Sequence, residues 1–504
     1  MKDKPFHLFL FGIFPPLILF VNNISTISAE QLILPIGIIL GTIIIFFLIL
    51  KPFIKNSLKI GLIISLGLVL FFSYGHAYML LEDVEIINDL KTKHILLVIP
   101  FLLLFIFGTR YFLKTKRKLD NATKIVNAIA ISLIIISVVN IADYSLRNTY
   151  SLEEISENYK SDFSKLKESP DMYLIILDGY AGKEILEKVY GYDNSKFLKF
   201  LDDKGFFIQE NGFSNYSTTM SSLSSITNME YVNYFSEQIG IDKQHESIPL
   251  KKISNSKVVD FFNSMGYVTV NYDSGEGAFR NINNADLNFC GKNTFLDSQL
   301  IALLLRTSML NIFYVGLFED DHRERILCAV EGIPQISKQF EEPTFVMSHM
   351  RLPHPPYIFG PNGEHVSPES LESGLSNWDD LDAYLNQVKF SNKIVSEIVE
   401  KILDSETPSV IIVLSDHGTG YKLNYQNDSS LFEMNQRLQN INFIYFPEED
   451  NVPIYDTITP VNIFRLIFNY YFEAEFELLE DRIFFSKYHT PYDYTEVTEL
   501  LKTP

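Results

Sequence analysis

Long apolar stretches separated by short polar connections occupy the first 145 residues of the chain. A segment of about 20 apolar residues is long enough to cross a bilayer as a helix. Pro15 and Pro16 interrupt the first stretch, so a cleaved signal peptide is the alternative there. Four further stretches and the lack of a small-residue cleavage site argue against it. The pattern predicts about five transmembrane helices in residues 1–145, over Phe6–Val21, Leu32–Leu50, Ile60–Tyr78, His94–Phe112 and Ile125–Ala142.

The charges between these stretches predict their orientation. Lysine and arginine gather before the first stretch, between the second and third, and between the fourth and fifth, whereas acidic side chains prevail in the other two connections. Because basic loops remain in the cytoplasm, we expect a cytoplasmic N-terminus and an extracytoplasmic chain after the fifth helix. The sequence thus predicts an integral protein of the inner or plasma membrane, with a juxtamembrane linker at 146–168 and an outer domain at 169–504.

The outer domain is strongly acidic. The formal net charge of the chain is −20, and the acidic excess lies after residue 150. An acidic surface repels nucleic acid, so we expect no nucleic-acid partner. The sequence makes no prediction of the oligomeric state.

The chain contains two cysteines, Cys290 and Cys328, and both lie in the predicted outer domain. An oxidising compartment would allow them to form a disulfide. Two unpaired buried thiols are an equal alternative, and a Cys-x-x-Cys metal pattern is absent.

Two apolar runs in the outer domain each end in an acidic residue. Met172–Leu177 leads into Asp178, and Ser409–Ser415 leads into Asp416 and His417. Such runs are typical of strands buried on both faces, and open α/β sheets bind ligands beyond the carboxyl ends of their strands. Two carboxylates and an imidazole can bind one divalent cation. Asp178 could instead cap the following turn, an alternative that the second strand end makes weaker.

A hydroxyl-rich stretch over residues 212–229 supplies another candidate group. Apolar residues recur at helical spacing from Met220 onwards, which predicts a helix that begins at about Thr219. The side-chain oxygen of a threonine at a helix N-terminus lies in the field of unpaired backbone N–H groups. Thr219 could therefore cap the helix or act as a nucleophile, and this stretch alone favours the cap.

A third predicted strand, Pro343–His349, runs into a proline-rich loop that should end it. His349, Arg351 and His354 would then lie near a strand end. Such groups can bind phosphate or sulfate oxygens, or donate a proton to a leaving group, whereas a lone histidine is more often structural.

The rest of the outer domain alternates predicted strands and helices, which is typical of α/β proteins. The amphipathic pattern of residues 379–403 predicts a helix that covers the sheet. Further strands are predicted at 205–210, 267–271 and 441–446, and further helices at 181–189, 195–204 and 458–472.

Four motifs in this order resemble the alkaline phosphatase superfamily, in its sulfatase-like membrane branch. They are Ile175–Tyr180, Ser214–Thr219 followed by Ser222-Leu223, His349–Tyr357 and Leu414–Gly418. The resemblance implies an α/β fold: an N-terminal five-helix transmembrane bundle followed by an alkaline-phosphatase-like mixed sheet sandwiched by helices.

By position, the resemblance implies four ligands of one divalent metal ion: Asp178, Thr219, Asp416 and His417. Thr219 would also be the nucleophile, with Thr218 as the fallback. His354, and more weakly His349, would bind the charged group of the substrate. Ligand type favours Zn²⁺ or Mn²⁺, with Mg²⁺ and Ca²⁺ as further candidates.

Membrane helices before an outer catalytic domain also resemble lipoteichoic acid synthases and phosphoethanolamine transferases. This resemblance implies an enzyme that transfers or hydrolyses a phospho-ester headgroup, of phosphoethanolamine or phosphoglycerol type, in two displacement steps. The donor would be a membrane lipid, and the acceptor a glycan or lipid of the cell envelope. In those enzymes the first ligand is usually glutamate, whereas Asp178 stands here.

Other functions remain as alternatives. One is a sulfuric-ester or phosphodiester hydrolase, although the Cys- or Ser-x-Pro-x-Arg site of arylsulfatases is absent around Thr219. Another is a non-catalytic binding module on a membrane anchor. A transporter core is disfavoured because the apolar stretches lack charged residues at their centres.

Overall fold

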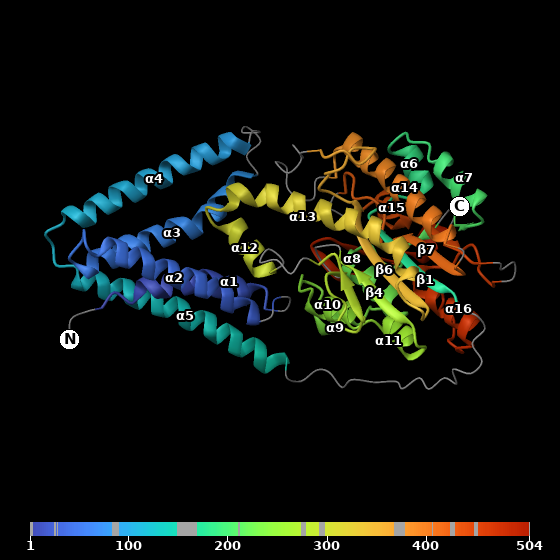
Figure 1. Ribbon diagram of the computed structural model, residues 1–504, viewed down its shortest axis with the longest axis horizontal. Helices are drawn as coiled ribbons and strands as arrows, with labels where there is room; N and C mark the ends of the chain where they lie inside the picture. Colours follow the sequence, from blue (N-terminus) through green and yellow to red (C-terminus); the bar gives the residue numbers. More distant parts are fainter. Residues whose placement is uncertain are drawn as a thin grey trace. The chain divides into compact units, whose positions relative to one another are not determined.

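The protein, seen in a computed structural model, divides into two compact units (Figure 1). The first unit contains Met1–Ser156 and Lys292–Phe318, and the second contains Glu157–Gly291 and Glu319–Pro504. The predicted linker at 146–168 lies mostly outside the described residues, and the predicted domain limits stay a prediction. The structure describes residues 4–24, 27, 29–82, 90–148, 169–209, 212–273, 279–291, 298–366, 378–405, 407–423, 429–447 and 452–502.

Five helices near the predicted positions form most of the first unit. They are α1 (His7–Asn22), α2 (Ile33–Leu50), α3 (Ser57–Glu82), α4 (Leu90–Lys114) and α5 (Asp120–Asn148), with a short helix η1 (Ala29–Leu32) before α2. Among the described residues, four helices are long and apolar enough to cross a membrane, namely those at Ala29–Leu50, Ser57–Leu80, His94–Lys114 and Asp120–Ala142. Helix α1 has only 16 residues, so a fifth crossing stays a prediction.

Two later elements complete the first unit. Helix α12 (Gln299–Thr307) belongs to it entirely, and so does the beginning of α13 (Asn311–Gly332) as far as Phe318. The chain therefore returns to its N-terminal unit after part of the second unit has been built. The linear division predicted from the sequence did not include this return.

A mixed seven-stranded sheet forms the centre of the second unit, in the order β2-β9-β7-β1-β6-β4-β5. Its middle strand β1 is parallel to both neighbours, β7 and β6, whereas β9 runs antiparallel to β7 and to β2. The strands are β1 (Asp171–Asp178), β2 (Phe207–Ile208), β4 (Val268–Tyr272), β5 (Leu287–Phe289), β6 (Thr344–Pro353), β7 (Ser409–Ser415) and β9 (Asn442–Tyr445).

Strand β1 is buried on both faces, as its unbroken apolar sequence predicts. Tyr173, Ile175 and Leu177 point into one core, which α14 covers, because alternate side chains of a strand point to opposite faces. The residues between them point into a second core, beneath α8, α11 and α16. The helices on the two faces are α6 (Lys183–Lys188), α7 (Ser195–Asp203), α8 (Thr219–Asn228), α10 (Ser247–Ser254), α11 (Lys257–Ser264), α14 (Leu381–Leu403) and α16 (Pro460–Phe472).

Smaller elements surround this sheet. They are β3 (Gly212–Phe213), which pairs with β8 (Gln439–Asn440), and β10 (Phe484–Lys487), which pairs with β11 (Thr490–Glu496). Short helices are α9 (Phe235–Gln238), η5 (Ile333–Lys338), α15 (Leu431–Leu438) and α17 (Thr498–Lys502).

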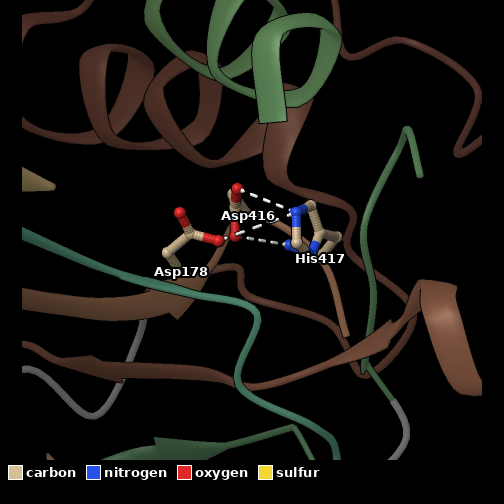
Figure 2. A group of neighbouring side chains, drawn as sticks. All are labelled: Asp178, Asp416 and His417. Carbon is tan, nitrogen blue, oxygen red and sulfur yellow. Dashed lines mark hydrogen bonds and ion pairs between the residues drawn. The ribbon is translucent and has the colours of Figure 1, made fainter. Parts of the chain in front are cut away.

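The parallel register brings the predicted strand ends together. Leu177 pairs with Ser415, so Asp178 and Asp416 follow at adjacent strand ends, as Figure 2 shows. One predicted boundary is wrong. Strand β6 does not end at His349 but continues to Pro353, because the prolines that stop it begin only there. His349 therefore lies within the strand, opposite Ile176.

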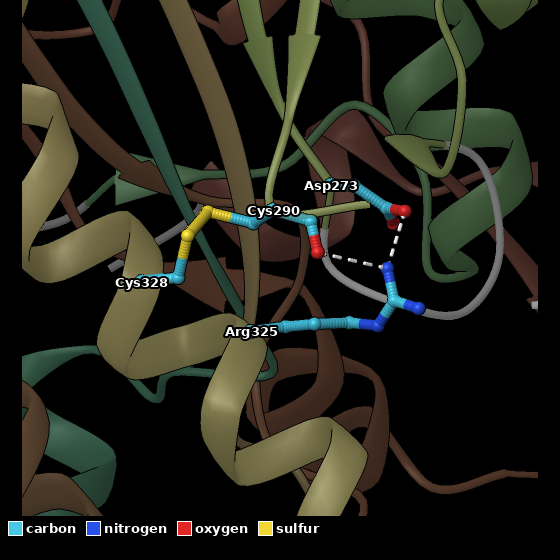
Figure 3. The surroundings of a disulfide bond; sticks show 4 residues. All are labelled: Asp273, Cys290, Arg325 and Cys328. Carbon is cyan, nitrogen blue, oxygen red and sulfur yellow. Dashed lines mark hydrogen bonds and ion pairs between the residues drawn. A yellow bond between two sulfur atoms is a disulfide. The ribbon is translucent and has the colours of Figure 1, made fainter. Parts of the chain in front are cut away.

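Cys290 and Cys328 form a disulfide that links the end of β5 to α13 (Figure 3). Of the two alternatives left open by the sequence, pairing is the one found. Beside the bond lies Arg325, whose side chain is 1% exposed. Its Nη1 donates to Asp273 Oδ2 at 2.6 Å and to the Cys290 carbonyl at 3.2 Å. A buried charge needs such partners.

We predict that replacing both cysteines by serine lowers the free energy of unfolding of the second unit. The bond closes a loop of 38 residues, and the chain-entropy model gives a loss of roughly 3 to 4 kcal/mol. The single tryptophan, Trp378, is buried in this unit, so its fluorescence in urea reports the unfolding. A reducing agent should reproduce the loss in the wild-type chain and have no effect on the double variant. A loss of less than about 1 kcal/mol would contradict the prediction.

Candidate active site

Asp178, Asp416 and His417 form one cluster at the carboxyl ends of β1 and β7 (Figure 2). One potential ligand atom of each lies within 4.8 Å of the others. All three side chains are buried, and the relative exposure of Asp416 and His417 is 0%. The strand ends therefore bring two carboxylates and an imidazole into a site from which water is largely excluded.

The two carboxylates have unsatisfied oxygen atoms. Asp416 Oδ1 accepts the backbone N–H groups of Gly179 at 3.0 Å and His417 at 2.9 Å. Among the described residues, Asp416 Oδ2 and Asp178 Oδ1 are buried and have no hydrogen-bond partner. Unpaired buried carboxylate oxygens are costly, so this part of the site fits a cation.

The backbone sets the orientation of His417. Its Nδ1 donates to the Gly418 carbonyl at 2.8 Å, since a carbonyl oxygen can only accept. The lone pair of Nε2 then faces the carboxylates, 3.4 Å from Asp416 Oδ2 and 3.7 Å from Asp178 Oδ1. A β-carbon at Gly418 would lie 2.3 Å from the Gln436 carbonyl, so only glycine fits this turn. Imidazole ligands of metals are commonly fixed by such a hydrogen bond at the other nitrogen.

Thr219 is the first residue of α8, and its hydroxyl points into the cluster. Its Oγ1 lies 3.0 Å from His417 Nε2, and the side chain is only half-buried. The cap interpretation fails, because the N-cap residue is Thr218 and no side chain caps this helix. Thr218 instead donates to Ser221 Oγ at 3.1 Å. Of the two candidate threonines, only Thr219 contacts the cluster.

The predicted substrate histidines lie at different places. His349 is at the cluster, with its Nε2 3.7 Å from Asp178 Oδ2 and 3.9 Å from Asp416 Oδ2. Neither of its ring nitrogens has a hydrogen-bond partner among the described residues. His354 lies in the turn just after β6, where its Nδ1 approaches the Pro355 carbonyl at 2.5 Å and Arg351 Nε at 3.2 Å. His349, which the sequence analysis gave as the weaker candidate for binding the substrate, is thus the histidine that lies beside the carboxylates.

Arg437, on α15, is a site residue that the sequence analysis missed. Its Nη2 donates to His417 Nε2 at 2.9 Å, and its Nε donates to the Ser217 carbonyl at 2.8 Å. A third bond joins Nη1 to the Gly418 carbonyl at 3.2 Å. The guanidinium thus connects the segment before α8 to the turn after β7. An arginine on a short amphipathic helix carries no local signal of such a role.

Burial is the largest influence on the pKa values of the site. It raises the pKa of Asp416 to about 6, and it raises the pKa of Asp178 well above its usual range, an effect that the Asp416 charge increases. Burial also lowers the pKa of His349 to about 3 and that of His417 well below its usual value. Both imidazoles are therefore neutral, so each keeps one ring nitrogen whose lone pair could bind a cation.

These observations fit a divalent metal ion held by Asp178, Asp416, His417 and Thr219. Ligand atoms that share one Zn²⁺ at about 2.0 to 2.2 Å lie roughly 3 to 4 Å from one another, as the atoms of this cluster do. The donor set of oxygens and one nitrogen is also acceptable to Mn²⁺. A cation would also balance the two carboxylate charges.

Sequence comparison assigns this domain. The model of the family described as Sulfatase matches residues 170–468, which is more than half of the chain. The chain belongs to the sulfatase family. All four candidate metal ligands lie within the matched segment of this sulfatase-family domain, which agrees with the resemblance to the sulfatase-like membrane branch. A search of curated proteins finds no significant match to the chain.

Solved structures give distant resemblances to the sulfatase-family chain. The zinc complex of the C-terminal periplasmic domain of EptC from Escherichia coli is 10% identical, with 65% of this chain and 92% of that chain covered, at a TM-score of 0.40. The integral membrane lipooligosaccharide phosphoethanolamine transferase A from Neisseria meningitidis is 12% identical, with 88% and 87% covered, at a TM-score of 0.34. An alkaline phosphatase superfamily protein from Vibrio parahaemolyticus is 12% identical, with 64% and 74% covered, at 0.40. Structures this distant say nothing about the substrate.

We predict that Asp178→Asn weakens binding of Zn²⁺ at least about 100-fold, because it removes a charged ligand. Metal content after dialysis, measured by mass spectrometry, checks this. Asp171→Asn is a matched control, since Asp171 is buried at the opposite end of the same strand and bonds to Thr344. Without metal, Asp178→Asn should be at least as stable as the wild type, because the unpaired charge is gone. Equal metal content in both variants would contradict the proposed site.

Proposed function

We propose that this protein is a membrane-anchored, metal-dependent enzyme that transfers or hydrolyses a phospho-ester headgroup, with Thr219 as the nucleophile. The observation that carries the proposal is the position of the Thr219 hydroxyl. Thr219 is a half-buried residue at the N-terminus of α8, and its Oγ1 lies 3.0 Å from His417 Nε2, beside two carboxylates with unpaired oxygens. The partial exposure of Thr219 supports access by a substrate, whereas the side chains of Asp178, Asp416 and His417 are buried.

The local structure favours a reactive Thr219 oxygen. As the first residue of α8, Thr219 lies at the positive end of the helix dipole, beside backbone N–H groups that have no partner within the helix. Negative charge that develops on its oxygen or on a bound ester is stabilised there. A divalent cation bound by Asp178, Asp416 and His417 would add charge stabilisation and lower the pKa of a hydroxyl.

In this reaction the Thr219 hydroxyl loses its proton and its oxygen forms a bond to phosphorus as the bond to the leaving alkoxide breaks. The leaving oxygen takes up a proton, and the phosphoryl group stays on the threonine. A second displacement by water or by an acceptor hydroxyl then releases it. His417 is fixed by its Nδ1 bond to Gly418, so its Nε2 stays directed at the site throughout. The fixed imidazole and the buried carboxylates require little reorganisation during the reaction.

The charges near the site and the membrane helices support the proposed substrate class. Arg437 and Arg351 both lie near enough to lower the pKa of Asp178, and each could bind an anionic ester oxygen. Four membrane-crossing helices keep the enzyme at a bilayer, so a lipid with a phosphorylated headgroup is the proposed donor. The acceptor would be a glycan or lipid of the envelope. The catalytic domain would lie outside the inner membrane, where the Cys290–Cys328 disulfide persists.

We predict that Thr219→Ala lowers turnover of a p-nitrophenyl phosphodiester at least about a thousandfold, because no nucleophilic oxygen remains. Thr219→Ser should retain measurable turnover. Thr218→Ala is the matched control, since its hydroxyl bonds only to Ser221 among the described contacts, and it should retain most activity. Intact-mass analysis of the full chain after exposure to candidate lipids should detect the transferred group on the wild type and not on Thr219→Ala. An adduct on Thr219→Ala would contradict the assignment.

We also predict that Arg437→Ala lowers kcat/KM without lowering the affinity for Zn²⁺. The guanidinium bonds to His417 Nε2, the atom that the cation needs, and repels a cation by its charge. Its loss should leave the affinity for Zn²⁺ unchanged or higher. The ratio kcat/KM should fall roughly 10- to 100-fold, mainly through a higher KM, because a charged partner of the anionic ester is lost.

Arg437→Lys separates this role from a structural one. Lysine keeps the charge but loses the planar fork that bonds to Ser217 and Gly418. If Arg437 contacts the substrate, the KM of Arg437→Lys should lie between that of the wild type and that of Arg437→Ala. If both variants bind metal more weakly, Arg437 serves only to hold the segment before α8 and the turn after β7 in place.

A further inference from the structure

Helix α12 and the corner that follows it are part of the first unit, although the sulfatase family model spans them. Leu300 and Leu304 of α12 pack against Phe20 of α1 and against Ile27. Residues 298–313, which we name the membrane insert, are therefore held by α1 and by α3, and α3 is long and apolar enough to cross a membrane.

Backbone contacts fix the depth of the insert along α3. Met309 N–H donates to the Phe71 carbonyl at 2.8 Å, and Gly75 touches the end of α12. The crossing segment of α3 ends at Leu80. At 1.5 Å per residue, Phe71 lies about 14 Å before that end, well inside a hydrocarbon layer about 30 Å thick. The turn at Met309 is therefore at membrane depth.

The other end of the insert lies at the edge of the membrane. Ser298 Oγ donates to Gln31 Oε1 at 2.9 Å, and Gln31 is in the short helix that begins the second crossing segment. Between Ser298 and Met309, α12 thus runs from the end of one crossing helix to the interior of another. This course is that of a re-entrant segment.

The corner between α12 and α13 is built for an environment without water. Polar backbone groups at such depth must find partners in the protein. The Arg306 carbonyl accepts from Asn311 Nδ2 at 2.8 Å, and Leu310 N–H donates to Ser308 Oγ at 3.2 Å. Together with the bond from Met309 to Phe71, these contacts give protein partners to three backbone groups of this non-helical turn.

Three apolar side chains of the corner face away from the protein. Leu310, Ile312 and Phe313 are 39%, 46% and 62% exposed within the described residues. A cluster of this kind is unfavourable in water and favourable against acyl chains, and the lipid-facing residues of α2, α4 and α5 have similar exposure. We propose that the membrane insert re-enters one half of the bilayer and places Leu310, Ile312 and Phe313 against lipid.

Fluorescence quenching of the full chain in phosphatidylcholine nanodiscs tests the proposal. A dye is attached to Phe313→Cys, since the native cysteines are paired and do not react. Doxyl-labelled lipid should quench this dye about twofold, and aqueous iodide should have little effect, if the position faces acyl chains. Quenching by iodide, or protection from both quenchers, would overturn the proposal.

Two labelled controls separate this inference from the proposed membrane placement. Phe107→Cys, 64% exposed on α4, should respond to doxyl lipid, and Tyr488→Cys, 59% exposed in the second unit, should respond to iodide. If doxyl lipid quenches the dye at Phe107 but not at Phe313, only the proposal that the membrane insert faces lipid is overturned. If doxyl lipid quenches the dye at neither position, the placement of the N-terminal helices in the membrane is overturned as well.

A second variant tests how the insert is held. A β-carbon at Gly75 would lie 2.2 Å from the Arg306 carbonyl, so Gly75→Leu should displace α12. We expect the dye at Phe313→Cys to become several times more accessible to iodide in this background. Gly37→Leu is the control, because a β-carbon at Gly37 meets nothing within 4 Å. Equal iodide access in the two backgrounds would show that Gly75 does not hold the insert.

Discussion

Two carboxylates without enough hydrogen-bond partners are buried side by side where β1 and β7 end. Isolated, such a pair is unfavourable, because burial penalises each charge and the charges repel each other. The raised pKa values of Asp178 and Asp416 express this cost. A divalent cation would remove the penalty, and the neutral nitrogen of His417 and the hydroxyl of Thr219 already face the carboxylates or the imidazole. The chemistry proposed here follows from this constraint.

The surrounding fold maintains that arrangement. Strand β1 is buried on both faces and is parallel to both neighbours, so its register with β7 sets the separation of the two acids. Hydrogen bonds from Gly179 and His417 orient one carboxylate, and Gly418 orients the imidazole. Arg437 then joins the turn after β7 to the segment before α8. The orientation of the candidate ligands thus depends on their hydrogen bonds to the backbone as well as on the ligands themselves.

The chain also links the catalytic sequence to the membrane in an unexpected way. The sulfatase-family segment is interrupted by residues 292–318, which belong to the same unit as the N-terminal helices, and α12 within them packs on α1 and α3. An enzyme with a lipid substrate gains from such an arrangement, since it would be attached to the bilayer by more than one stretch of chain. Cys290 precedes this interruption and Cys328, on α13, follows it. The disulfide therefore joins the two parts of the second unit that the interruption separates in sequence.

The sequence by itself determined the features that depend on local pattern. Apolar runs placed the membrane helices and β1 and β7, and each strand run ended in the acid that the site uses. Helical spacing placed the start of α8 at Thr219. Only the tertiary structure decided that Thr219 faces His417 and does not cap its helix, that His349 approaches the carboxylates, and that Arg437 joins the site. It also decided the cysteine pairing and the return of α12 to the membrane unit. These are contacts between distant residues, and their geometry comes from strand register and packing, which local periodicity does not encode.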